Sequence, residues 1–66
     1  MQILLNGENR DLPSPLTVSG LLVAIGLGEK RVAVEVNREV VPRSRHESRT
    51  LAEGDRVEII QAIGGG

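Results

Sequence analysis

The residues whose chemistry stands out lie at the end of the chain, where Gly64, Gly65 and Gly66 follow an apolar segment. Glycine has no side chain, so such a stretch can thread a narrow channel whose walls approach the main chain closely. Fully extended, residues 62–66 reach at most about 17 Å, which is enough to enter a neighbouring active site. A frayed chain end is the alternative interpretation of these glycines.

The reactive group that such a tail presents is the α-carboxyl group of Gly66. An α-carboxyl group is ionised at neutral pH, and a carboxylate anion is a poor acyl electrophile. No other residue of the chain is suited to activating it. The sequence therefore predicts that Gly66 is modified by another enzyme and is not itself a catalytic group.

The remaining side chains do not form a recognisable catalytic or metal site. The chain has no Cys and a single His, which argues against a transition-metal centre, and we interpret His46 as a solvated loop residue. The serines lack the elbow motif of a nucleophilic Ser. Gly26-Leu27-Gly28 follows an expected helix, whereas a dinucleotide-binding glycine motif precedes one. We therefore expect no catalytic residue, no bound metal or cofactor, and no enzymatic activity.

The composition excludes several classes of partner. Lys and Arg total 8 and Asp and Glu total 9, the formal net charge is -1, and the chain has no aromatic residue. It therefore lacks the positive field and the stacking side chains that are typical of nucleic-acid binding. No apolar run approaches the roughly 20 residues of a membrane span, and no targeting segment is recognisable. We expect a cytoplasmic protein that is monomeric on its own.

A local basic cluster departs from this even balance of charge. Arg43, Arg45 and Arg49 lie close to His46 in a polar stretch of the sequence. Nucleic-acid binding is not favoured, because acidic residues elsewhere cancel the field. A solvated surface is the simpler interpretation of the cluster, and a docking patch for an acidic partner protein is the alternative.

The elements that must position the tail begin with a hairpin. Residues 2–5 are a short apolar run, and Asn6-Gly7 is typical of a type I′ turn, in which both central residues have positive φ. Residues 8–12 are expected to return as a polar edge strand. Pro13 ends this strand, because proline cannot donate a hydrogen bond to a sheet.

A short amphipathic helix is predicted next. Thr17 is a good N-cap residue, and apolar residues follow at helical spacing, at positions 18, 21, 22 and 25. Gly26 suits the position after the helix, where positive φ is common. Gly20 inside the helix costs about 1 kcal/mol relative to Ala. The helix is therefore weak alone and needs a sheet to cover.

Residues 31–62 supply the rest of the sheet. An alternating strand over 31–36, a tight turn at Asn37-Arg38 and a returning strand over 39–41 form a second hairpin. A polar connection over 43–50 and a turn over 53–55 lead into the last strand, 56–62. We expect an α+β domain in which a mixed sheet of about five short strands packs on one helix, with the last strand beside the first. The expected core is aliphatic: Ile3, Leu5, Leu16, Val18, Leu21, Leu22, Ile25, Val32, Val34, Val36, Val57 and Ile59.

Several segments, taken in order, carry a resemblance to a known family: MQILLNG at 1–7, LTV at 16–18 with LL at 21–22, VEVNREVVPR at 34–43, LAEGDRVEII at 51–60 and AIGGG at 62–66. Together they resemble the thiamine-biosynthesis sulfur carrier (ThiS) family of ubiquitin-like β-grasp proteins. Each segment alone is weak, but their order over essentially the whole chain is specific. Gly20 departs from the polar or acidic residue often found early in that family's helix, which bears on helix stability and not on the carrier role.

The resemblance implies a β-grasp domain over residues 1–62 and a flexible glycine tail over 63–66. Gly65 and Gly66 match the family's terminal pair, and Gly64 would extend the threading tail. An ATP-dependent adenylyltransferase would convert the Gly66 carboxylate to an acyl adenylate. Sulfur from a persulfide donor enzyme would then displace AMP and leave a thiocarboxylate. Thiazole synthase would accept this sulfur while building the thiazole ring of thiamine, so that the carrier is a protein co-substrate and catalyses nothing.

Strand alternation adds a docking hypothesis. The residues on either side of a core position in a strand face away from the helix. This alternation places apolar residues on the outer face of the sheet: Leu4, Ala33, Ile60 and Ala62. They would form a patch that leads toward the tail, and scattered surface aliphatics are the alternative interpretation.

Other functions remain open from the sequence. A molybdopterin-type sulfur carrier uses the same tail chemistry, although such proteins are usually longer and richer in aromatic residues. A ubiquitin-like modifier would be joined through Gly66 to lysines of other proteins. A plain interaction module would still function without Gly65 and Gly66.

Overall fold

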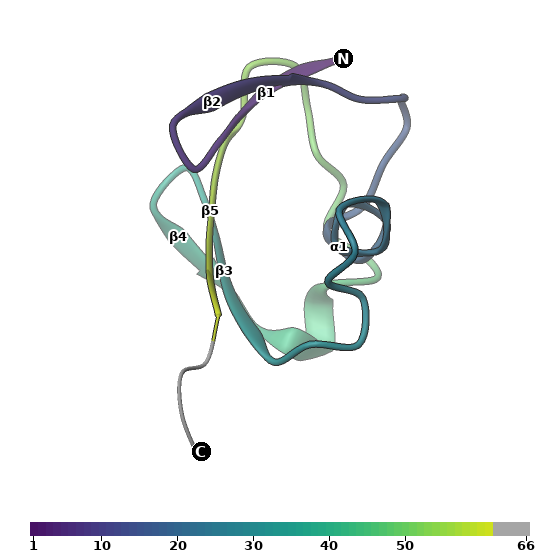
Figure 1. Cartoon of the computed structure of the whole chain (residues 1–66), viewed down its shortest axis with the longest axis vertical. Coiled ribbons are helices and arrows are strands. Elements are labelled where there is room, and N and C mark those ends of the chain that lie inside the picture. The colour runs from purple at the N-terminus through teal and green to yellow at the C-terminus, as the bar shows by residue number, and fades with distance from the viewer. Residues whose placement is uncertain (62–66) are drawn as a thin grey trace.

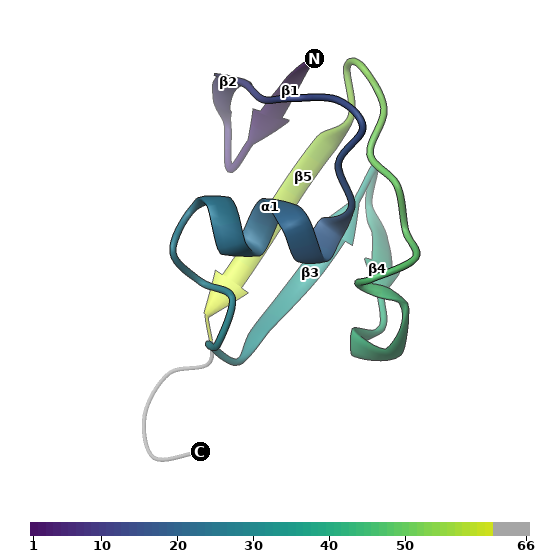
Figure 2. The ribbon, with the colours of Figure 1, turned by 90° about the vertical axis from the view of Figure 1, so that its right-hand side faces the viewer.

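A five-stranded mixed sheet packs against one α-helix in residues 1–61, the part of the chain that the computed structural model describes (Figure 1). The sheet forms one layer and α1 forms the second. The helix axis runs across β5 and β3 (Figure 2). This arrangement confirms the expected α+β architecture. In chain order the elements are β1 (Gln2–Leu5), β2 (Glu8–Asp11), α1 (Val18–Ala24), β3 (Val32–Val36), β4 (Glu39–Val41), the short 3-10 helix η1 (Arg43–Arg45) and β5 (Arg56–Gln61).

The last strand, β5, lies at the centre of the sheet, whose strand order is β2-β1-β5-β3-β4. It runs parallel to β1, with Leu5 opposite Val57, and antiparallel to β3, with Val32 opposite Gln61. The expected pairing of the last strand beside the first is therefore confirmed. β5 ends at Gln61, and Ala62, which we expected to close the strand, lies outside the described residues.

Both hairpins turn where the sequence predicts. Asn6 and Gly7 have φ angles of 48° and 83°, and Asn37 and Arg38 have φ angles of 52° and 70°. All four residues thus adopt the left-handed conformation that a type I′ turn requires. Asn enters this region at less cost than most residues because its short polar side chain can hydrogen-bond locally.

Helix α1 is capped as the sequence predicts. Thr17 Oγ1 accepts a hydrogen bond from the Gly20 N–H at 3.1 Å, and Gly26 follows the helix with a φ angle of 82°. A Cβ atom on Gly20 would lie 2.9 Å from Leu16 Cδ1, at the end of a flexible side chain, so a larger residue at this position requires the Leu16 side chain to shift. At 7 residues α1 cannot span a bilayer, and no other helix within residues 1–61 is long and apolar enough to do so.

The core between α1 and the sheet is aliphatic throughout, as expected. Sequence reasoning missed Val41, which ends the edge strand β4, and Leu51, which lies in the irregular connection before β5 where no periodic pattern marks it. Leu16, Ile25 and Val32 were expected in the core and are only partly buried at its margin. The buried residues are Ile3, Leu5, Val18, Leu21, Leu22, Val34, Val36, Val41, Leu51, Val57 and Ile59.

Candidate functional site

The predicted reactive tail follows directly on the central strand of the sheet. Gly64, Gly65 and Gly66, together with the predicted docking residue Ala62, lie outside the residues that the structure describes. Gln61, at the end of β5 as described, is the last described residue before this segment. In both ribbon views β5 ends beside the start of β3, where Gln61 is opposite Val32 (Figures 1 and 2).

The end of β5 is held on both sides. On one side it pairs with β3 from Val57 up to Gln61. On the other side β1 has already turned away, and the side chain of Asn6 replaces it. Asn6 Oδ1 accepts a hydrogen bond from the Ile59 N–H at 2.8 Å, and its Nδ2 donates to the Ile59 carbonyl at 3.4 Å. Sequence reasoning assigned Asn6 to the turn and missed this second role.

A buried carboxylate ties the start of β5 to the second hairpin. Asp55 is 8% exposed and accepts hydrogen bonds from the Ala52 N–H at 2.8 Å and from Asn37 Nδ2 at 3.0 Å. Asn37 Oδ1 in turn accepts from the Arg56 N–H at 2.9 Å. Each carboxylate oxygen of Asp55 thus accepts a structural hydrogen bond, so the group serves to join these segments.

Two of the predicted docking residues meet on the outer face of the sheet. Ala33 lies directly opposite Ile60 across the β3–β5 pair, and Ile60 is 59% exposed. Leu4 is opposite Arg56 on the same face. Arg56 precedes Ile60 by four residues, about 13 Å along a strand, so Leu4 is not adjacent to the Ala33–Ile60 pair. We refer to Ala33 and Ile60 together as the outer apolar pair.

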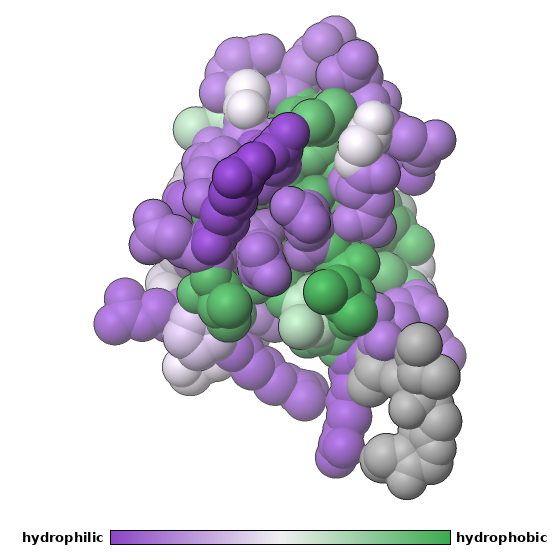
Figure 3. Space-filling view, turned by 90° about the vertical axis from the view of Figure 1, so that its left-hand side faces the viewer, coloured by the Kyte–Doolittle hydropathy of each residue, from purple (hydrophilic) through white to green (hydrophobic). Residues whose placement is uncertain are grey.

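A further apolar residue on this face was missed. Val40 on β4 is 70% exposed and lies opposite Glu35, which in turn is opposite Glu58 on β5. The two glutamates thus stand in the row next to the outer apolar pair. Figure 3 shows the result: apolar surface gathers in the lower part of this face, in separate areas with hydrophilic surface around them. Val40 is a strand residue of a hairpin that the sequence predicts, and alternation along β4 would have placed it outward.

His46 is buried, which corrects the expectation of a solvated loop residue. It is 9% exposed, its Nε2 lies 3.1 Å from the Val41 carbonyl oxygen, and its own carbonyl accepts a hydrogen bond from the Ser19 N–H at 2.8 Å. The 3-10 helix η1 turns the chain back onto β4 and α1, and His46 directly follows it. A polar stretch without periodicity gives no signal for this fold-back.

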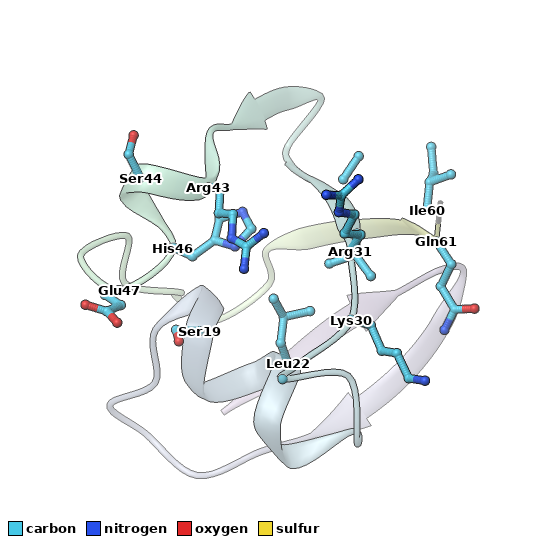
Figure 4. Close-up of a pocket in the computed structure, with 13 residues that line it drawn as sticks. Ser19, Leu22, Lys30, Arg31, Arg43, Ser44, His46, Glu47, Ile60 and Gln61 are labelled. Atoms are coloured by element: carbon cyan, nitrogen blue, oxygen red, sulfur yellow. The ribbon is translucent and has the colours of Figure 1, made fainter. Parts of the chain in front are cut away.

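The residues of the basic cluster expected around His46 differ in their exposure. Arg43 and Arg45 are exposed on η1, whereas Arg49 is partly buried and donates from Nη1 to the Thr50 carbonyl at 2.7 Å. Arg43 and His46 instead line a groove of about 640 Å³ that the sequence did not predict. The groove lies between α1, η1 and the start of β3, and it extends to Ile60 at the end of β5 (Figure 4).

No arrangement suited to a metal ion is present in the described part of the chain, where His and acidic side chains nowhere gather in a group of three. Buried side-chain polar atoms in residues 1–61 all have hydrogen-bond partners. None of these buried groups is therefore left unpaired and directed at a ligand. The features that could serve a function are the base of the tail, the outer apolar pair and the groove.

A mixed sheet with one helix across it and its last strand at the centre defines the ubiquitin-like β-grasp class. A crystal structure of a thiamine biosynthesis protein (ThiS) from Geobacter metallireducens superposes with a TM-score of 0.85 at 33% identity, covering 100% of both chains. The ThiS family model matches residues 3–66, and the chain belongs to the ThiS family.

The relatives include both short proteins and a longer one. The chain is 30% identical to the sulfur carrier protein ThiS of Escherichia coli over 66 residues, which is 100% of both proteins. It is 41% identical over 66 residues to a thiazole synthase of Paramagnetospirillum magneticum, and there it spans only 20% of the relative's length. The same kind of domain therefore occurs alone and as one part of a larger polypeptide.

Proposed function

We propose that the protein carries sulfur for thiazole formation in thiamine biosynthesis. Its membership of the ThiS family supports this, as does the full-length match to a protein named as a sulfur carrier. The observation that carries the proposal is structural. The central strand β5 ends at Gln61, and the sequence continues with Ala-Ile-Gly-Gly-Gly. The protein acts in the cytoplasm as a co-substrate of other enzymes and is not a catalyst.

The reactive group in this proposal is the carboxylate of Gly66. In the active site of an adenylyltransferase, its oxygen attacks the α-phosphorus of ATP and pyrophosphate leaves, which produces an acyl adenylate. The terminal sulfur of a donor enzyme's persulfide then attacks the acyl carbon and displaces AMP, which gives an acyl disulfide. A second thiol of the loading system attacks the donor's sulfur, breaks the S–S bond and forms a disulfide with the donor, and the thiocarboxylate on Gly66 is released. ATP binds to the adenylyltransferase and not to this chain.

The folded body contributes a fixed base for a thin tail. Hydrogen bonds from β3 and from Asn6 hold β5 up to its end, so its last residues cannot swing away from the sheet. Residues 62–66 then reach at most about 17 Å beyond the body. Gly64 and Gly65 carry no side chains, which lets channel walls close around the main chain. The body stays outside the active site while Gly66 reaches the reacting groups.

Thiazole synthase is the acceptor that the relatives support. In the Paramagnetospirillum magneticum thiazole synthase, the segment similar to this chain is part of the same polypeptide as the rest of that protein. Linking two binding partners raises their effective concentration toward each other. A fusion is useful only if the two parts meet, so it favours direct delivery of sulfur from the carrier to the synthase.

Intact-protein mass spectrometry tests the proposal. After incubation with the adenylyltransferase, ATP and a persulfide donor, we expect the mass to rise by the difference between one sulfur and one oxygen atom. Deletion of Gly66 should abolish the rise and leave the folded body unchanged. A wild-type mass that stays constant with an active partner would overturn the proposal.

Complementation distinguishes the proposal from the other carriers. Expression of the chain should restore growth of a thiamine auxotroph that lacks its own carrier, and it should not restore molybdoenzyme activity in the corresponding mutant. Growth supported by a variant without Gly65 and Gly66 would indicate an interaction module. Recovery of Gly66 joined to lysines of other proteins would indicate a modifier.

A further inference from the structure

The groove beside the base of the tail has a composition unlike the rest of the surface. Its cationic residues are Lys30 and Arg31, just before β3, and Arg43, the first residue of η1. Arg31 and Arg43 come from opposite walls of the groove (Figure 4). The same view shows the Glu47 carboxylate at the lower left, on the other side of the groove from Lys30 and Arg31.

The charge of the groove is opposite to that of the whole molecule. Lys30, Arg31 and Arg43 stand against one carboxylate, Glu47, a local surplus of two positive charges, whereas the chain has a formal net charge of -1. Within residues 1–61 the only ion pair joins the N-terminal amine to Asp11. The groove cations are therefore not neutralised by acidic side chains of the described body.

The walls between these cations are aliphatic. Three aliphatic residues line them: Leu22, which is buried, Val32, which is half-buried, and Ile60, which is 59% exposed. Phosphate sites usually rely on converging main-chain N–H groups, and nucleic-acid surfaces on a broad positive field or aromatic stacking. An aliphatic groove with cations at its edges suits a peptide instead, one whose aliphatic side chains face the walls and whose carboxylates face the cations.

We propose that this groove binds a segment of mixed aliphatic and acidic residues on thiazole synthase, the enzyme that accepts the sulfur. The inference rests on the proposed function and adds the chemistry of the partner. Charge complementarity favours this occupant. Ile60 and Gln61 line the groove and end the described part of β5, so a segment bound there lies at the base of the tail. Binding at this point would hold the partner next to the end of β5, from which the sequence continues to Gly66.

The groove cations act mainly on the rate of association. Arg31 and Arg43 are exposed, and charges at the rim of an interface steer the partner during diffusion more than they add to final affinity. Salt at physiological ionic strength screens such charges over about 8 Å. The contribution of the groove should therefore weaken as salt is added.

The test measures binding of the full-length carrier to thiazole synthase from the same organism, by stopped-flow and calorimetry at low and high salt. The test variant is Arg31→Glu/Arg43→Glu. The control is Arg10→Glu/Arg38→Glu, which makes the same change in net charge at exposed residues that do not line the groove. Circular dichroism checks that both variants are folded.

We expect the groove variant to bind at least about tenfold more weakly at low salt, mostly through a lower association rate, and to lose most of its salt dependence. The control should bind like the wild type. If the two variants bind equally well while the wild-type carrier is still loaded with sulfur, the groove is not the binding site, and the proposed function stands. Failure of the wild type to gain sulfur would overturn both.

Discussion

Asn6 shows how much one side chain can contribute to the position of a strand. It turns the first hairpin at a φ angle of 48° and also hydrogen-bonds to both main-chain polar groups of Ile59. These contacts join residues that are 53 positions apart in the sequence. A turn motif predicts the first role, but no local pattern predicts the second, because it depends on where the last strand comes to lie.

Replacing Asn6 by Gly separates its two roles. Gly adopts positive φ at least as easily as Asn, so the turn is kept while the hydrogen bonds to Ile59 are lost. We expect the free energy of unfolding to fall by about 1–2 kcal/mol in urea denaturation, with faster amide exchange at Ile59. Asn6→Asp is the control, since it keeps the acceptor for the Ile59 N–H. An Asn6→Gly variant as stable as the wild type would contradict this role.

Ile60 belongs to the outer apolar pair, where an aliphatic side chain is exposed without a structural reason. We predict that Ile60→Glu weakens adenylation, because a charge would have to be desolvated when a partner covers this face. The fold should be retained, since Ile60 is 59% exposed. Val23→Glu is the matched control, as Val23 is 68% exposed but lies on α1. An unchanged adenylation rate for Ile60→Glu would refute the docking hypothesis.

The turns and the ends of the helix could be predicted from the sequence, because the conformation of a few neighbouring residues determines them. The two Asn-led turns, the Thr17 cap and the glycine after α1 each correspond to a conformation that few residues adopt well. The 3-10 helix η1 and the burial of His46 were not predictable, because they depend on contacts with β4 and α1 that a polar stretch does not encode locally. The groove escaped prediction for the same reason, since its walls come from separate elements.

Helix α1 provides a prediction at the scale of one element. Thr17→Ala removes the side-chain acceptor of the Gly20 N–H and should lower the free energy of unfolding by about 1 kcal/mol. Thr17→Ser keeps the hydroxyl group and should retain most of the stability. Thermal unfolding measured side by side would show the difference. Equal losses in the two variants would mean that the Thr17 methyl group, and not the cap, stabilises the helix.

The molecule as a whole divides the work between a rigid body and a reactive end. The body could be predicted from periodicity, turns and the family resemblance, including the parallel neighbours β1 and β5. The role of the Gly66 carboxylate is predicted from the sequence, because Gly66 lies outside the described residues. A change confined to that end should therefore alter sulfur loading and leave stability untouched.

A carrier extended by one residue after Gly66 tests this division. The added amino acid converts the Gly66 carboxyl group to a peptide amide, which cannot be adenylated. We expect no mass gain on incubation with the activating system and no stimulation of thiazole formation, whereas the midpoint of thermal unfolding should match the wild type. Normal thiazole formation by a non-removable extension would refute the role of the Gly66 carboxylate.

The position of β5 also has a consequence for how the protein is made. The strand order β2-β1-β5-β3-β4 means that the hairpins β1–β2 and β3–β4 touch within the sheet only through the last strand. On the ribosome the two hairpins emerge first and stay unconnected until that strand is released. A chain truncated before β5 lacks the strand that joins the two hairpins, so its sheet edges are unpaired and its core is open, and we expect proteases to cleave it readily. The body can therefore fold only after β5, the segment that precedes the glycines, has been synthesised.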